Sequence, residues 1–264
     1  MERILKAVES VVLRTGAFIL ESSGKFQRQQ IEEKSENNFV TWVDRAAEEM
    51  LAEGLNAILP DAGFILEENS RAPEIREFTW VVDPLDGTTN FIHGIPLVCI
   101  SVSLLRGNEP EIGVVYEVFG REMFTAQRGQ GAHLNGKKIR VSSNASLQHA
   151  LLATGFPYYD YERLDEYLAL FRHLMQASHG IRRLGSAAAD LAWVACGRFD
   201  GFYEYGLSPW DVAAGALLVK EAGGCVADFG GGRHYLFGKE IVAGNDAIFP
   251  ELLSTMKNFF KSKP

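Results

Sequence analysis

The sequence predicts an α/β protein in which sheets and helices are stacked in layers. In the first part of the 264-residue chain, short apolar runs separated by turns indicate meandering β structure, whereas strand-like and helix-like segments alternate from about residue 145 onward. The length allows one large domain or two closely packed halves. We expect an N-terminal α+β half over residues 1–145 and a C-terminal α/β half over residues 146–264.

The N-terminal half opens with apolar residues at helical spacing, which predict a helix over residues 2–22. Residues 22–38 are polar and are expected to form a mobile loop or an edge element. A second helix is expected to begin at Asp44, which has the character of an N-cap. Apolar runs separated by turns follow, and the last turn is the hairpin signal Asn135-Gly136. These runs predict strands over residues 64–66, 80–83, 97–105, 111–118 and 121–127.

The C-terminal half alternates strands with helices. Its predicted strands cover residues 150–154 and 200–204. Its predicted helices cover residues 161–177, 186–196 and 210–222, and the glycine pair at residues 223–224 supplies a helix stop. Elements of this kind bury their apolar faces by packing helices against sheets.

The composition argues against several classes of protein. The net charge of −8 argues against nucleic-acid binding as the main activity, because phosphate backbones are bound by clustered Lys and Arg. No apolar run is long enough to span a membrane, and the N-terminus does not resemble a signal peptide. The three cysteines, Cys99, Cys196 and Cys225, have no metal-binding spacing and are expected to be reduced core residues of a cytoplasmic protein.

The most informative segment places two carboxylates directly after an apolar run. Asp83 and Asp86 lie three positions apart, and Pro84 is expected to end the strand because it has no N–H to donate. Gly87 permits a tight turn whose N–H groups can face an anion. Acids that converge beside a phosphate need cations, and hard divalent ions with oxygen ligands are the natural candidates. A single Asp-x-x-Asp is a weak signal, because most such pairs are solvated loop acids or helix caps.

Three further acidic positions strengthen the metal hypothesis. Asp44, Glu67 and Asp211 each stand at a predicted strand end or helix start, where site residues gather in α/β proteins. Taken singly, Asp44 and Asp211 are explained as favourable charges at helix N-termini, and one acid of the pair Glu67-Glu68 as a solvated loop residue. Taken together, acids that converge carry too much negative charge for a site without metal.

Two features are candidates for contact with an organic substrate, and each has a structural alternative. The segment Gly185-Ser186-Ala187 precedes an apolar helix, where it forms either a small-residue packing surface or a set of N–H donors for hydroxyls or phosphate. Glu204 is interpreted as an exposed strand acid rather than an acceptor for polyol hydroxyls. His93 is interpreted as structural, because the ligands around it are hard oxygen donors.

With these residues assembled, the chain resembles the inositol monophosphatase family of metal-dependent, lithium-sensitive phosphatases. Residues 83–91 (DPLDGTTNF) match the first family motif, and residues 210–215 (WDVAAG), continuing to residues 221–224 (EAGG), match the second. The resemblance covers essentially the full length. It implies a layered α-β-α-β-α sandwich of the sugar-phosphatase type, usually a homodimer, in which the N-terminal half carries most of the metal ligands.

The resemblance also implies the roles of individual residues. It implies two to three Mg²⁺ ions, with Mn²⁺ as the alternative ion, held by Glu67, Asp83, the carbonyl of Leu85, Asp86 and Asp211. A leucine stands at position 66, where the family usually has a glycine. The catalytic residues implied are Asp44 and Thr88, which orient the attacking water, together with Glu67. The substrate contacts implied are Asp86, Gly87, Thr88, Gly185, Ser186, Ala187 and Glu204.

By this resemblance the protein hydrolyses inositol monophosphates, such as myo-inositol-1-phosphate, to inositol and phosphate with a metal-activated water. Its expected partner is therefore a small phosphorylated polyol. The alternative within the superfamily is fructose-1,6-bisphosphate or another small phosphate ester. An alternative of another class is a binding partner of the transcription machinery, as some bacterial relatives are. Arg182-Arg183 is a candidate for such a surface or for a dimer interface.

Overall fold

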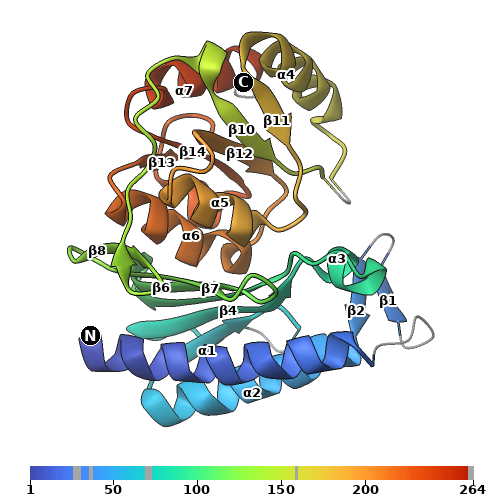
Figure 1. Ribbon diagram of the computed structural model, residues 1–264, viewed down its shortest axis with the longest axis vertical. Helices are drawn as coiled ribbons and strands as arrows, with labels where there is room; N and C mark the ends of the chain where they lie inside the picture. Colours follow the sequence, from blue (N-terminus) through green and yellow to red (C-terminus); the bar gives the residue numbers. More distant parts are fainter. Residues whose placement is uncertain (26–30, 36–37, 69–72, 158–159, 261–264) are drawn as a thin grey trace.

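Two mixed β-sheets, one of seven strands and one of five, organise the protein. Helices cover both faces of each sheet, so that the layers alternate α-β-α-β-α (Figure 1). The computed structural model describes residues 1–25, 31–35, 38–68, 73–157 and 160–260, and for residues 31–35 and 38–39 the description covers the backbone alone. The predicted α/β class and its layered sandwich are confirmed.

The seven-stranded sheet follows chain order because tight turns join most of its neighbours. Its strands are β3 (Gly63–Leu66), β4 (Phe78–Asp86), β5 (Cys99–Arg106), β6 (Glu109–Glu117), β7 (Glu122–Gln127), β8 (Gly131–Leu134) and β9 (Lys137–Lys138). Strand β3 is parallel to β4, and each later pair is antiparallel. Asn135 (φ 49°) and Gly136 (φ 75°) form the predicted hairpin turn between β8 and β9.

The five-stranded sheet has the order β11-β10-β12-β14-β13. Its strands are β10 (Leu151–Thr154), β11 (Gly180–Arg182), β12 (Gly201–Tyr205), β13 (Cys225–Ala227) and β14 (Glu240–Gly244). Strand β10 is parallel to both its neighbours, whereas β14 is antiparallel to β12 and β13. A separate hairpin pairs β1 (Ile31–Ser35) with β2 (Asn38–Thr41). Of the segment 22–38 that was predicted as a mobile loop or an edge element, residues 31–35 and 38 belong to this hairpin, whereas residues 22–23 end the first helix.

The helices form three of the five layers. They are α1 (Glu2–Ser23), α2 (Trp42–Ile58), α3 (Thr88–His93), α4 (Leu164–Ala177), α5 (Ala187–Ala195), α6 (Pro209–Glu221) and α7 (Phe249–Phe259). Helices α1 and α2 lie side by side on the outer face of the large sheet, α4 and α7 cover the outer face of the small sheet, and α5 and α6 lie between the sheets (Figure 1). Helices α3 and α7 were not predicted from the sequence.

Separate apolar clusters fill the spaces between the layers. Residues such as Val12, Leu51 and Ile100 join α1 and α2 to the large sheet. Leu170 and Leu252 belong to the cluster that joins α4 and α7 to the small sheet. The third cluster is rich in alanine and surrounds α5 and α6. Small side chains there allow the two helices to fit between two sheets.

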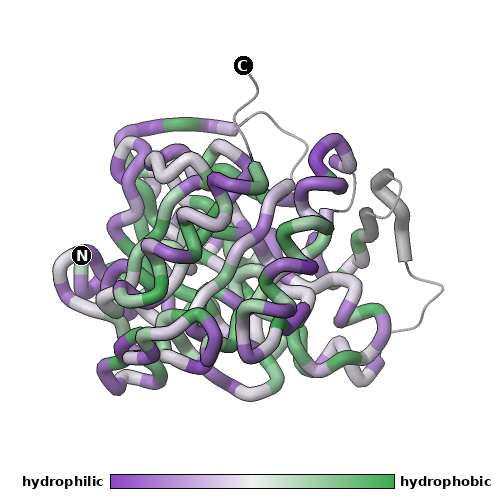
Figure 2. Tube along the Cα trace, turned by 90° about the horizontal axis from the view of Figure 1, so that it is seen from above, coloured by the Kyte–Doolittle hydropathy of each residue, from purple (hydrophilic) through white to green (hydrophobic). Residues whose placement is uncertain are grey.

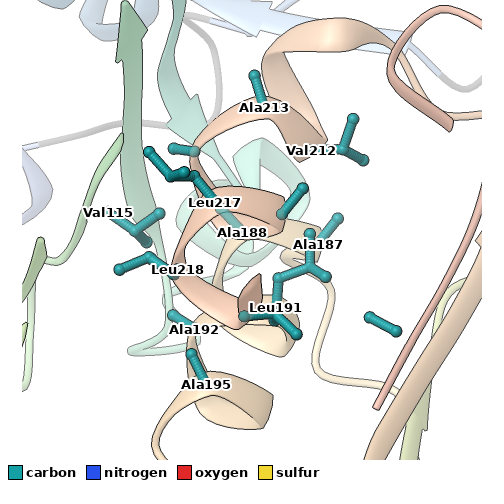
Figure 3. Close-up of a cluster of buried hydrophobic side chains, with 14 of the residues drawn as sticks. Val115, Ala187, Ala188, Leu191, Ala192, Ala195, Val212, Ala213, Leu217 and Leu218 are labelled. Atoms are coloured by element: carbon teal, nitrogen blue, oxygen red, sulfur yellow. The ribbon is translucent and has the colours of Figure 1, made fainter. Parts of the chain in front are cut away.

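The central helices approach their neighbours very closely. A Cβ on Gly215 of α6 would lie 2.5 Å from the Cβ of Leu191 on α5, and a Cβ on Gly113 of β6 would lie 2.8 Å from the carbonyl oxygen of Ala214. Figure 3 shows Leu191 beside α6, whose Leu218 lies near Val115 of the large sheet. Glycine at positions 113 and 215 is therefore a packing requirement that fixes where α6 lies.

Hydrophilic residues interrupt the hydrophobic ones along the chain (Figure 2). Across the described ranges, no helix is both long enough and apolar enough to cross a membrane. All three cysteines are free thiols. Cys99 is buried, as predicted, whereas Cys196 and Cys225 are only half-buried because they lie at a helix end and on the outermost strand of the small sheet.

Candidate active site

A cavity of about 130 Å³ is lined by residues from both sheets and from the starts of α3, α5 and α6. Residues that are far apart in the sequence therefore line the same cavity. Every site residue predicted from the sequence except Asp44 lines this cavity: Glu67, Asp83, Leu85, Asp86, Gly87, Thr88, Gly185, Ser186, Ala187, Glu204 and Asp211. The structure thus brings the predicted set together.

Strand β4 delivers the first two acids, and it does so differently from the prediction. Pro84 does not end the strand, which continues to Asp86. Asp83 lies opposite Ser101 and Asp86 opposite Cys99, so one residue of β4 has no counterpart and the pairing is irregular between the two acids. A bulge accommodates the missing N–H of proline within a paired strand. The bulge places both carboxylates at the cavity.

Asp44 lies behind the cavity and is held by hydrogen bonds. The N-cap of α2 is Thr41, so the predicted start of the helix at Asp44 is wrong by two residues. Asp44 is the third residue of a capping box, in which its Oδ2 accepts from the Thr41 amide at 2.8 Å. Its Oδ1 accepts from the Thr88 hydroxyl at 3.1 Å. The same carboxylate therefore caps a helix and orients a hydroxyl that faces the cavity.

The acids of the cavity repel one another because their charges lie close together. Asp83 is 1% exposed. Burial raises its pKa well above the usual range, and the nearby charges of Glu67, Asp86 and Asp211 raise it further. Burial also raises the pKa of Asp211, with Asp86 as the next cause. Cations that neutralise these carboxylates would remove the repulsion.

Asp86 joins the two halves of the chain. Its Oδ2 accepts hydrogen bonds from the Ser186 hydroxyl and from the amide of Ala188, each at 2.7 Å. Ser186 is the N-cap of α5 and also accepts from the amide of Ala189. Burial raises the pKa of Asp86 to about 6, and the two hydrogen bonds and the charge of Arg183 limit the rise.

Asp211 is part of a capping box at the start of α6, as Asp44 is at the start of α2. It is the third helical residue, and its Oδ2 accepts from the amide of Ser208 at 2.6 Å. The interpretation of Asp211 as a favourable charge at a helix N-terminus therefore holds, while the side chain also lines the cavity.

The donor set fits a hard divalent cation. Carboxylates and the backbone carbonyl of Leu85 supply oxygen atoms only. Within the part of the chain that the structure describes, no three Asp, Glu, His or Cys side chains form the ligand set of one ion. Asp86 and Asp211 instead accept backbone N–H groups. Mg²⁺ suits such a site, because it binds through one or two carboxylates and keeps several waters.

Glu204 is buried, so its interpretation as an exposed strand acid is wrong. It is 6% exposed and lies on β12 at the cavity. A Cβ on Gly155 would fall 1.9 Å from its Oε1, so the carboxylate occupies the space that a side chain at position 155 would need. Burial raises the pKa of Glu204 to about 8, Arg183 lowers it, and Asp86 raises it.

Comparison with known proteins identifies the family. A sequence model described as "Inositol monophosphatase family" matches residues 1–259. The chain belongs to the inositol monophosphatase family. The resemblance found in the two sequence motifs is thereby confirmed over nearly the whole chain.

Curated relatives and solved structures agree with this membership of the inositol monophosphatase family. The "Nus factor SuhB" of Pseudomonas aeruginosa is 44% identical over 262 residues, which are 97% of either protein. The "Inositol-1-monophosphatase" of Mesorhizobium japonicum is 40% identical over 255 residues, which are 96% of either protein. The crystal structure of the extragenic suppressor protein suhB from Bartonella henselae superposes with a TM-score of 0.91 at 38% identity and covers 97% of this chain and 98% of that one.

Sequence reasoning missed several residues that shape this inositol monophosphatase cavity. The Nδ2 group of Asn90 donates to the carbonyls of Leu97 and Leu184, each at 2.9 Å, and so ties the segment before α5 to the first motif. Asp190 lines the cavity from α5. The signal for Asp190 was available, because it is the single charged residue of an otherwise apolar helix.

The arginine pair is divided between two environments. Arg182 is exposed, whereas Arg183 lines the cavity and lies over the ring of Phe156. The assignment of Arg182-Arg183 to a protein-binding surface or a dimer interface stays a prediction, and Arg183 also contributes to the cavity. His93 is exposed at the end of α3 and does not line the cavity, in agreement with its structural interpretation.

Proposed function

We propose that this protein is a Mg²⁺-dependent phosphomonoesterase that hydrolyses inositol monophosphates, with myo-inositol-1-phosphate as the first candidate substrate. The observation that supports it most is the convergence of Glu67, Asp83, Asp86 and Asp211 on one cavity in which burial and mutual repulsion raise the pKa of Asp83. The relative named "Inositol-1-monophosphatase", at 40% identity over 96% of the chain, supports the substrate class.

Magnesium held by these carboxylates and by the Leu85 carbonyl would neutralise phosphate charge and lower the pKa of water. Phosphate monoesters hydrolyse extremely slowly without catalysis, so both effects are needed. The chain's own residues bind the phosphate and position the water. Gly87 and Thr88 line the cavity, and Gly87, with its positive φ of 106°, is the N-cap of α3 there.

Thr88 is the residue that positions the water. Its hydroxyl has one proton, which it donates to Asp44 Oδ1 at 3.1 Å or to the Leu85 carbonyl at 3.2 Å. Its lone pairs then accept a hydrogen bond from a water molecule in the cavity. Thr88 therefore orients the attacking oxygen and is not itself a nucleophile. Glu67, the third proposed catalytic residue, lines the same cavity, as does Asp83.

The polyol part of the substrate would contact cavity residues at the start of α5 and on β12. Gly185, Ser186 and Ala187 line the cavity where the chain enters α5, and Glu204 lines it from β12. The hydroxyl of Ser186 is already engaged with Asp86, so substrate contact at this segment falls mainly to backbone groups. Asp86 accepts hydrogen bonds from this segment, at Ser186 and Ala188, and is proposed both as a metal ligand and as a substrate contact.

A panel of substrates tests this proposal. Phosphate release from myo-inositol-1-phosphate, fructose-1,6-bisphosphate, 3′-phosphoadenosine 5′-phosphate and histidinol phosphate is measured with Mg²⁺, with Mn²⁺ and with EDTA. We expect inositol phosphate to be hydrolysed fastest, EDTA to stop the reaction and Li⁺ to inhibit it. If fructose-1,6-bisphosphate were hydrolysed fastest, the protein would instead be a sugar bisphosphatase. Activity in EDTA would refute metal dependence.

The names of other relatives support a second function. We propose that the chain also binds the transcription machinery, because the relative from Pseudomonas aeruginosa, 44% identical, is named "Nus factor SuhB". The surface would lie outside the cavity, where Arg182 is exposed. Binding to purified transcription proteins by the Asp83→Asn variant separates the roles, since a binding surface outside the cavity survives loss of turnover. Light scattering of the same samples tests the proposed homodimer.

A further inference from the structure

Asp190 is a buried acid that the proposed reaction does not use. It is 1% exposed, and its Oδ1 has no hydrogen-bond partner among the described residues. The other residues of α5 are alanine, leucine, valine and tryptophan. Buried polar atoms in native proteins are almost always hydrogen-bonded, and an unpaired one destabilises the fold. A residue of this kind requires an explanation outside stability.

Helix capping does not explain Asp190. Ser186 is already the N-cap of α5, and its hydroxyl accepts from the amide of Ala189. Asp190 lies one position beyond the first three helical residues, and its own amide makes the ordinary helical bond to the Ser186 carbonyl. No salt bridge to Asp190 is found within the described ranges. Among the described residues, the Oδ1 atom of Asp190 is therefore left without a structural partner.

The cavity itself supplies the explanation. Asp190 lines it, as do Glu204 and Arg183. Burial raises the pKa of Asp190, the charges of Glu204 and Asp86 raise it further, and the charge of Arg183 lowers it. Asp190 and Glu204 come from different elements, α5 and β12, and both line the cavity, close enough for the charge of Glu204 to act on Asp190.

We propose that Asp190 determines substrate specificity by accepting a hydrogen bond from one hydroxyl of a polyol while Glu204 binds a neighbouring hydroxyl. The proposal rests on the proposed function, because it assigns a partner to the organic part of the phosphate ester. A site with two buried oxygen groups favours a ligand that offers two hydroxyls and disfavours one that leaves them unpaired. The chemical class selected is therefore a phosphate ester with adjacent hydroxyls.

The test compares two substrates in the full-length protein with Mg²⁺. We measure kcat/KM for myo-inositol-1-phosphate and for phenyl phosphate, which has no hydroxyl on its organic part. Asp190→Ala is expected to lower the ratio of the two values by about tenfold or more, since a substrate hydroxyl loses its acceptor. Asp190→Asn keeps the shape and one acceptor oxygen, so its ratio should lie between those of Asp190→Ala and the unmodified protein.

Thermal unfolding separates specificity from a structural role. Removal of an unpartnered buried acid should leave the Tm of Asp190→Ala equal or higher, whereas loss of a structural contact would lower it. Asp165→Asn, which removes an exposed acid from α4, is the matched control for the change in net charge. An unchanged substrate ratio, or an equal loss on both substrates together with a lower Tm, would overturn the proposal.

Failure of the proposed function gives a different result. In that case the unmodified protein does not hydrolyse inositol phosphate at all, whatever residue occupies position 190. Equilibrium binding of myo-inositol-1-phosphate, measured by calorimetry, then decides the proposal for Asp190. A Kd about tenfold weaker in Asp190→Ala supports it, and an equal Kd or no binding by either protein overturns it.

Discussion

At the scale of single residues, Asp83 carries a charge that its surroundings disfavour. It is buried, and the first cause of its raised pKa is desolvation, followed by the charges of Glu67, Asp86 and Asp211. We propose that an acid in this environment serves to bind a cation, since an amide of the same shape would be more stable in its place. Stability and activity should therefore respond in opposite directions when this acid is removed.

We predict that Asp83→Asn lowers phosphate release by more than about a hundredfold, because a proposed metal ligand is lost. Its Tm in EDTA should equal or exceed that of the unmodified protein, because a buried like charge is removed. Asp165→Asn, an exposed acid, controls for net charge. Near-normal activity of Asp83→Asn in excess Mg²⁺ would show that Asp83 is not a ligand.

Thr88 allows a separate prediction about the attacking water. Thr88→Ala should lower kcat by about a hundredfold or more and change KM little, because the hydroxyl is needed to orient the water and not to hold the substrate. Thr88→Ser keeps the hydroxyl and should recover most of kcat. Steady-state kinetics on both variants measure the split, and a raised KM with normal kcat would make Thr88 a binding residue.

Glu204 gives a prediction about pH. Its pKa rises from 4.5 in the unfolded chain to about 8 in the fold, chiefly through burial. Between these values the native state holds a proton that the unfolded state releases, so this acid lowers stability progressively as the pH rises from about 4.5 to about 8. Glu204→Gln should remove this dependence and be more stable by about 1–3 kcal/mol above pH 8.

Urea unfolding of both proteins in EDTA, at about pH 5 and about pH 8, measures the effect. Other acids titrate in both proteins, so the contribution of Glu204 is the difference in the free energy of unfolding between the two proteins at each pH. The expected difference in the free energy of unfolding grows with pH. A difference that is the same at both pH values would mean that Glu204 is not protonated in the fold.

At the scale of elements, short α3 connects two segments that form the cavity. Asn90 on α3 donates to the carbonyls of Leu97 and Leu184, and the second of these directly precedes Gly185. Asn90→Ala leaves both carbonyls without this donor and should lower the free energy of unfolding by about 1–3 kcal/mol. It should also lower kcat/KM, because the segment before α5 loses its anchor.

Urea unfolding and steady-state kinetics measure the two effects of Asn90→Ala. Asn108→Ala in the exposed turn after β5 is the control, since it removes the same side chain from a solvated position. If Asn90→Ala behaved like Asn108→Ala, the hydrogen bonds of Asn90 would not hold the segment at residues 184–187.

Helices and strands with clear apolar periodicity and flanking turn residues were predictable from the sequence. Short strands that form only by pairing with neighbouring strands were not. The helices over residues 2–22 and 210–222 and the strands of the large sheet have clear apolar periodicity and turn residues. Strands β11 and β13 have three residues each and are held by pairing with β10 and β14. The start of α2 was misjudged because Thr41 and Asp44 are both good capping residues, and only the backbone decides between them.

The same distinction applies to the site. Acids at strand ends and helix starts were predictable because α/β architecture brings those positions together. The contact between Asp86 and Ser186 joins residues 100 positions apart, and no local pattern reports it. The burial of Glu204 depends on Gly155 in another strand-end segment, so its pKa and accessibility could not be read from its own surroundings in sequence.

At the scale of the whole molecule, both halves of the chain contribute to one cavity. Helix α6 contacts strands of the large sheet and strands of the small sheet, and it carries Asp211. The division at residues 145 and 146 remains a prediction about chain organisation. Because acids from both halves face each other, ions that bind between them should stabilise the complete fold.

We predict that Mg²⁺ raises the Tm of the unmodified protein by several degrees over its value in EDTA, since the ion binds the native state and relieves repulsion. Asp83→Asn should show a much smaller rise, because it lacks a central ligand and has less repulsion to relieve. Scanning calorimetry with Mg²⁺ and with matched NaCl measures both. An equal rise in both proteins would place the stabilising ion elsewhere.

The close approach of Gly113 to Ala214 has a consequence for natural variation in this family. Gly113 lies on a strand that supplies no residue to the cavity, and Ala214 is one turn beyond Asp211. A single methyl group added at position 113 would push α6 away from the sheet and carry Asp211 with it. A homologue with both signature motifs intact could therefore be inactive, and surveys that infer activity from motifs alone should also inspect this glycine.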